Sequence, residues 1–144
     1  MAEFVVVLGC SEPGAGDALV GFVEASYPDA RREDMLIPGG PWWIARAAPA
    51  GQSRIGKWIA AGTRHRLADI LQDWIERREA LAVEIAGHEG CSWYEREYPS
   101  VSAGERVRRQ GEDIAAATGI ARGLVRVVVR GRFVRADGTV ATIL

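Results

Sequence analysis

This sequence of 144 residues lacks an excess of positive charge, a long apolar run and a basic start. Its formal net charge of -1 argues against nucleic-acid binding, which needs a basic surface. No apolar stretch approaches the ~20 residues of a membrane span, so no membrane partner is expected. The start, Met1–Phe4, carries Glu3 rather than the basic residues of a signal peptide, and we therefore expect a cytoplasmic protein.

Cysteine and histidine are also scarce, with two copies of each. Because cysteines stay reduced in the cytoplasm, a metal-binding or catalytic role is favoured over a structural disulfide. Three of these four residues lie in two short segments, Leu8–Cys10 and Ala86–Cys91. Each segment follows an apolar run, and this arrangement is the main lead that the sequence offers.

The two apolar runs, Glu3–Gly9 and Ala80–Ala86, are typical of parallel strands that are buried on both faces. A further strand is predicted to begin at Met35–Ile37, and Trp42–Ala47 is interpreted as a strand or a core-lining loop. An Asp-Gly pair at 137–138, between apolar segments, indicates a C-terminal hairpin.

Helical patterns separate these strands. An apolar stripe predicts a helix over Thr63–Glu79, with His65 off the stripe and exposed to solvent. The Ser-x-x-Glu spacing of Ser102 and Glu105 opens a helix predicted to end near Thr118. The alternation predicts one domain over residues 1–144, an α/β three-layer sandwich with a mostly parallel central sheet and an antiparallel edge hairpin.

Parallel strands bring their carboxyl ends to the same edge of a sheet, where ligands bind. If the first and third strands are neighbours, Cys10, His88 and Cys91 converge there. Two thiolates and an imidazole suit zinc, and three protein ligands leave one position open. Zinc with an open position lowers the pKa of bound water to about 7, which provides hydroxide near neutral pH.

Other interpretations of these residues stay open. The competing interpretation of these residues is a pair of buried thiols beside a hydrogen-bonded histidine. A Cys10–Cys91 dithiol switch is less favoured, because no Cys-x-x-Cys motif accompanies it. Gly14 and Gly16 allow a metal-free small-molecule binder with a phosphate-cradling loop. However, the spacing of these glycines matches neither a P-loop nor a dinucleotide-binding fingerprint.

Several motifs in order resemble the β-class carbonic anhydrases. They are Cys10-Ser11-Glu12, Pro38-Gly39 ahead of an apolar stretch with Arg46, Gly87 to Cys91, and the hairpin around Arg130–Phe133 and Asp137-Gly138. The resemblance implies zinc held by Cys10, His88 and Cys91. It also implies hydration of CO2 to bicarbonate through a zinc-bound hydroxide, in a homodimer or higher homo-oligomer.

The sequence departs from that family beside the first cysteine. The family pattern is Cys-x-Asp-x-Arg, in which the arginine holds the acid away from zinc, whereas this chain has Glu12 and Gly14. Glu12 is therefore either the hydrogen-bond partner of the zinc hydroxide or a fourth ligand that closes the site. The second alternative predicts a catalytically silent zinc-binding domain, unless another arginine such as Arg46 replaces the missing one.

Overall fold

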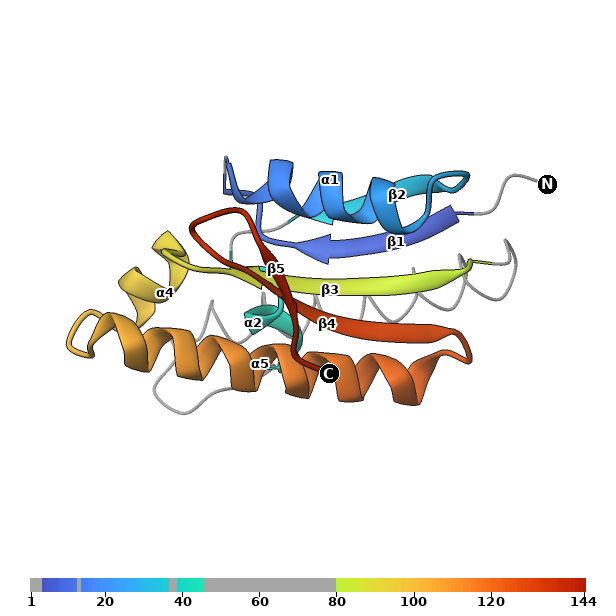
Figure 1. The fold of residues 1–144 in the computed structure, drawn as a ribbon. Helices are drawn as coiled ribbons and strands as arrows, with labels where there is room; N and C mark the ends of the chain where they lie inside the picture. Colours follow the sequence, from blue (N-terminus) through green and yellow to red (C-terminus); the bar gives the residue numbers. More distant parts are fainter. Residues whose placement is uncertain (1–3, 13, 37–38, 46–79) are drawn as a thin grey trace.

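A five-stranded sheet forms the centre of the fold in the computed structural model, which describes residues 4–12, 14–36, 39–45 and 80–144 (Figure 1). The strand order is β2-β1-β3-β4-β5, with β1–β4 parallel and β5 antiparallel to β4. The strands are β1 (Phe4–Gly9), β2 (Arg31–Leu36), β3 (Ala82–His88), β4 (Val128–Val134) and β5 (Val140–Thr142). The predicted fold class is confirmed, including the antiparallel hairpin.

Helices cover both faces of the sheet and make the fold three layers deep (Figure 1). The helix α1 (Ala15–Ser26) lies on one face, and α5 (Ala103–Leu124) lies on the other. Alternate residues of β1 serve the two layers: Val5 and Val7 belong to the apolar cluster of α1, whereas Val6 and Leu8 belong to the cluster of α5. A strand buried on both faces needs an unbroken apolar sequence, which explains the valine run.

The strands β1 and β3 are neighbours, as the predicted site requires. Val5 pairs with Ala82 and Leu8 pairs with Ile85, so both strands end at the same edge of the sheet. Two short helices, α2 (Trp42–Ala45) and α4 (Ser92–Glu97), complete the described elements. In the described part of the chain, no helix is long and apolar enough to cross a membrane.

Two predictions near the second strand were wrong. The strand β2 begins at Arg31 rather than at Met35. It lies at the sheet edge, where polar side chains can stay at the surface, and Arg32 forms ion pairs with Asp34 and with Glu24 of α1. The stretch predicted as strand or loop from Trp42 is instead the helical turn α2, in which the Ala45 N–H donates to the carbonyl of Pro41 at 3.0 Å.

The helix α5 begins as predicted but ends later. The Ser102 hydroxyl accepts a hydrogen bond from the Glu105 N–H at 3.1 Å, which confirms the capping residue. The helix then continues past Thr118 to Leu124, and the strand β4 begins at Val128. Gly119 costs the helix about 1 kcal/mol, and the burial of Ala121 and its neighbours on the sheet outweighs this cost. The predicted helix Thr63–Glu79, with His65, lies outside the described residues.

Candidate metal centre

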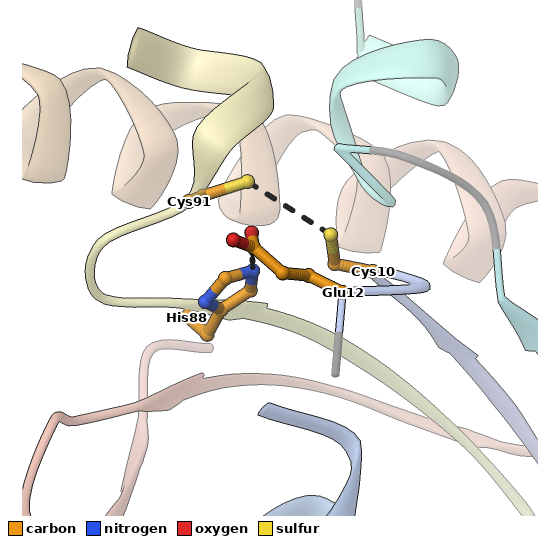
Figure 2. A group of neighbouring side chains, drawn as sticks. All are labelled: Cys10, Glu12, His88 and Cys91. Atoms are coloured by element: carbon orange, nitrogen blue, oxygen red, sulfur yellow. Dashed lines mark hydrogen bonds and ion pairs between the residues drawn. The ribbon is translucent and has the colours of Figure 1, made fainter. Parts of the chain in front are cut away.

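Four side chains meet at the carboxyl edge of the sheet: Cys10, Glu12, His88 and Cys91 (Figure 2). One potential ligand atom from each lies within 4.8 Å of those of the other three. The cysteines and the histidine are buried, whereas the Glu12 side chain remains 28% exposed. The structure therefore brings together all four residues that the sequence singled out.

The ends of two neighbouring strands position these groups. Cys10 follows the last residue of β1, and His88 is the last residue of β3. Gly90, at a φ of 72°, turns the chain so that Cys91 returns to the site as the residue before α4. The Glu89 N–H donates to the Val134 carbonyl at 2.8 Å, which fixes the end of β3 against β4.

A glycine pair packs directly against the first cysteine. Gly39 and Gly40 have φ values of 78° and 46°, and the Gly39 N–H donates to the Cys10 sulfur at 3.4 Å. A Cβ on Gly40 would lie 2.8 Å from the Gly9 carbonyl carbon, and one on Gly39 would lie 2.4 Å from the Trp93 ring. Only glycine lets this loop come close enough to place a backbone donor on the sulfur.

The two sulfur atoms are 3.9 Å apart. Two thiolates on one tetrahedral zinc, each at ~2.3 Å, lie about 3.8 Å apart, so this spacing suits a shared ion. The hydrogen bond between the thiols, with help from His88 and two backbone N–H groups, lowers the pKa of Cys10 to about 4. The same contact raises the pKa of Cys91, so the first thiolate of the pair forms readily.

His88 directs an unpaired nitrogen into the cluster. Its Nδ1 lies 3.0 Å from the Glu89 carbonyl, and a carbonyl oxygen only accepts hydrogen bonds, so Nδ1 carries the proton in the neutral ring. Nε2 then presents a lone pair, and among the described residues it is buried with no hydrogen-bond partner. Burial alone would lower the pKa of His88, but the Cys10 sulfur and the Glu12 carboxylate raise it.

The Glu12 carboxylate faces that same nitrogen, with Oε2 at 3.3 Å from Nε2. A carboxylate oxygen and an imidazole lone pair repel each other unless a proton or a metal ion lies between them. Two thiols, an unpaired imidazole nitrogen and a carboxylate match the ligand chemistry of zinc. Because His88 Nε2 is buried without a hydrogen-bond partner among the described residues, we conclude that this set of side chains fits a zinc ion.

Ser92 is a member of this group that sequence reasoning missed. Its backbone N–H donates to Glu12 Oε2 at 3.0 Å, and its hydroxyl donates to Oε1 at 2.5 Å. Partial burial works against ionisation of Glu12, but these two hydrogen bonds lower its pKa below the ordinary value. The one sequence signal was the position of Ser92 directly after Cys91. The alternative considered from sequence, Arg46, lies outside the described residues.

A cavity of about 210 Å³ opens onto this group. Cys10 and Glu12 line it together with Ser92, Trp93 and Arg96. The Arg96 guanidinium lies 6.0 Å from the centre of the Trp93 ring. The cavity is large enough for a molecule of a few heavy atoms, and Arg96 gives its wall a positive charge.

Comparison with known proteins defines the class of fold. No protein-family model and no curated protein matches the sequence. Solved structures do match, and those described below are β-carbonic anhydrases. The chain therefore has a fold like that of the β-carbonic anhydrases.

Three matches illustrate this similarity, and each aligns with 99% of this chain. The tetrameric β-carbonic anhydrases of the ascomycete Sordaria macrospora give a TM-score of 0.59 at 11% identity, over 81% of the matched chain. CafA of Aspergillus fumigatus gives 0.52 at 13% identity over 76%. The Coccomyxa enzyme, solved in complex with acetazolamide, gives 0.51 at 12% identity over 72%.

Proposed function

We propose that this protein is a zinc-dependent enzyme of the carbonic anhydrase type, which converts CO2 and water to bicarbonate and a proton. Cys10, His88 and Cys91 would hold the metal. The observation that carries the proposal is the convergence of two cysteines, the unpaired His88 Nε2 and Glu12 at one edge of a β-carbonic-anhydrase-like sheet. The donor set and the fold support the same conclusion independently.

The chemistry follows from this donor set. A zinc ion with a free coordination position lowers the pKa of bound water to about 7, and so supplies hydroxide near neutral pH. The Gly39 N–H stabilises the negative charge on Cys10, and the Glu89 carbonyl orients the His88 ring, as outer partners of metal ligands commonly do. Glu12 would accept a hydrogen bond from the attacking water, and Arg96 would attract the bicarbonate product through the cavity.

A stopped-flow CO2 hydration assay on zinc-loaded protein tests this proposal. We expect activity that rises with pH, that is lost in Cys91→Ser, and that is retained in Arg126→Met, an exposed residue near the opposite edge of the sheet. A fully zinc-loaded protein with no activity at any pH would contradict it. We further propose a homodimer or higher homo-oligomer, and sedimentation of the zinc-loaded protein at the mass of a single chain would refute this.

A second function, a catalytically silent zinc-binding domain, is favoured by one observation. Glu12 Oε2 lies 3.3 Å from His88 Nε2, close to the spacing of about 3.3 Å between a nitrogen and an oxygen ligand of one tetrahedral zinc. Glu12 would then fill the fourth position. The Glu12→Gln variant separates the two functions: if Glu12 closes the site, we expect this variant to gain CO2 hydration activity, whereas a catalytic Glu12 predicts a loss.

A further inference from the structure

Ser92 makes both hydrogen bonds that the described residues provide to the Glu12 carboxylate. The backbone N–H contacts Oε2 at 3.0 Å and the hydroxyl contacts Oε1 at 2.5 Å, so each oxygen has its own donor. Hydrogen bonds to an ionised carboxylate are roughly twice as strong as neutral ones. Together the two bonds fix both the position and the rotation of the carboxylate.

This fixed position points Glu12 at the ligand atoms instead of away from them. Oε2 faces His88 Nε2, and the carboxylate lies between His88 and Cys91 (Figure 2). The carboxylate oxygens that bind metals are themselves usually hydrogen-bonded to outer groups. Ser92 makes outer hydrogen bonds of this kind, because they leave Oε2 of Glu12 close to the potential ligand atoms of Cys10, His88 and Cys91.

Ser92 can hold Glu12 because Ser92 is itself held. It is the first residue of α4 and follows Cys91 directly. The helix is anchored by Tyr94, whose buried hydroxyl donates to Asp113 Oδ2 of α5 at 2.6 Å. Movement of Glu12 out of the cluster therefore has to break the Ser92 hydrogen bonds, because α4 does not follow it.

We propose that Ser92 is a positioning residue that holds the Glu12 carboxylate beside the atoms that would bind the metal, and so hinders small anions from reaching the metal. The inference rests on the zinc site of the proposed function but not on its activity. Loss of the Ser92 hydroxyl leaves the Glu12 carboxylate free to move away from this place. An external anion then reaches the metal more easily, although Cys10, His88 and Cys91 are unchanged.

The test uses the full chain loaded with cobalt(II), whose visible absorption reports its ligands, and thiocyanate as the anion. We expect the wild-type spectrum to change only at high thiocyanate concentration. In Ser92→Ala the dissociation constant for thiocyanate should fall about 10-fold to 100-fold, the equivalent of one hydrogen bond to a charged group. Ser92→Thr, which keeps the hydroxyl, should behave as wild type, as should Ser100→Ala, an exposed serine between α4 and α5.

Glu12→Gln gives a second route to the same answer if Ser92→Ala folds poorly. It should also bind thiocyanate more tightly, and adding Ser92→Ala to it should change nothing further, because the two residues act as one unit. Equal thiocyanate affinity in wild type and Ser92→Ala, or additive effects in the double variant, would overturn the inference. If the wild-type protein binds no cobalt, both this inference and the zinc site are refuted. If the cobalt-loaded protein shows the expected thiocyanate response but no CO2 hydration, only the enzymatic proposal is refuted.

Discussion

Two buried polar groups lie four residues apart on β3, and they differ in how they are satisfied. Glu84 is fully buried, and its carboxylate accepts hydrogen bonds from Arg132 at 2.8 and 3.2 Å and from the Tyr27 hydroxyl at 2.8 Å. His88 presents a nitrogen without a hydrogen-bond partner among the described residues, facing a carboxylate. The first group is satisfied by protein atoms alone, whereas the second has a nitrogen that is available to a proton or a metal ion.

This difference separates a structural role from a functional one. A buried ion pair that is fully hydrogen-bonded adds little net stability, but removing one partner is strongly destabilising because it leaves the other charge buried without compensation. A buried donor set that is left incomplete costs folding free energy, and binding of an ion would offset this cost. Four variants test the comparison, because each should affect one of the two groups and leave the other unchanged.

The largest effect is expected from Cys91→Ser. This variant removes a thiolate ligand. Loss of an outer hydrogen-bond partner lowers metal affinity by up to about 100-fold, so loss of a ligand should lower zinc affinity by much more. The free energy of unfolding of the metal-free protein should fall by at most about 1–3 kcal/mol, the cost of burying a hydroxyl in place of a thiol. Zinc titration against a competing chelator measures the first quantity and urea unfolding the second. A variant that keeps the wild-type zinc affinity would remove Cys91 from the site.

Arg132→Met should have the opposite effect, with a lower free energy of unfolding and an unchanged zinc affinity. It leaves the Glu84 charge buried without its main partner, at a cost of about 3–5 kcal/mol in the free energy of unfolding. Zinc affinity of the folded protein should be unchanged. Arg130→Met is the matched control, because Arg130 is exposed on the same strand. If urea unfolding shows a loss of less than about 1 kcal/mol in the free energy of unfolding, the Glu84–Arg132 pair does not stabilise β3 as proposed.

Tyr27 makes the stability contributed by the Glu84 group, which consists of Glu84, Arg132 and Tyr27, sensitive to alkaline pH. Burial and the hydrogen bond to Glu84 raise the pKa of Tyr27 from 10.0 to about 12. Because the pKa is raised on folding, the stabilisation is complete below pH 10 and is lost as the pH rises through about 12. The stability of Tyr27→Phe should therefore fall less between these pH values than that of wild type. Parallel pH profiles in urea unfolding would contradict the assignment.

The smallest effect is expected from Arg96→Met at the cavity. An exposed charge contributes roughly 0.2–1 kcal/mol, so the KM for bicarbonate dehydration should rise about 3-fold. The kcat should stay near the wild-type value because Arg96 contacts none of the four cluster residues in the described contacts. The effect should shrink at high ionic strength, where screening is stronger. An unchanged KM at low salt would exclude Arg96 from bicarbonate binding.

The sequence predicted the features of this fold that depend on local pattern. The unbroken apolar run of β1, the Asp-Gly hairpin and the Ser102 cap were each readable, because they reflect burial on both faces, turn chemistry and helix capping. The polar edge strand β2 was misjudged because its stability comes from pairing with β1, which a polar sequence does not reveal. The end of α5 was misjudged because packing on the sheet outweighed the low helix propensity of Gly119.

The candidate site, like the fold, was predictable only where the sequence carries a local signal. Cys10, His88 and Cys91 were found because scarce residue types stood at the ends of two apolar runs. Glu12 was found through the family resemblance. The contact of Ser92 with Glu12 was not predictable, because it joins residues 80 positions apart and depends on how α4 sits on α5. The position of Ser92 directly after Cys91 was the one sequence signal, and it does not specify a contact with Glu12.

The central claim, a zinc ion held by two sulfurs, one nitrogen and one oxygen, is tested most directly by X-ray absorption at the zinc edge of the reconstituted wild-type protein. We predict about one zinc per chain, with two sulfur atoms at about 2.3 Å and two nitrogen or oxygen atoms at about 2.0–2.1 Å. A shell without sulfur, or zinc below about one-tenth of an ion per chain after reconstitution, would contradict it, since a structural-type site of this composition binds tightly.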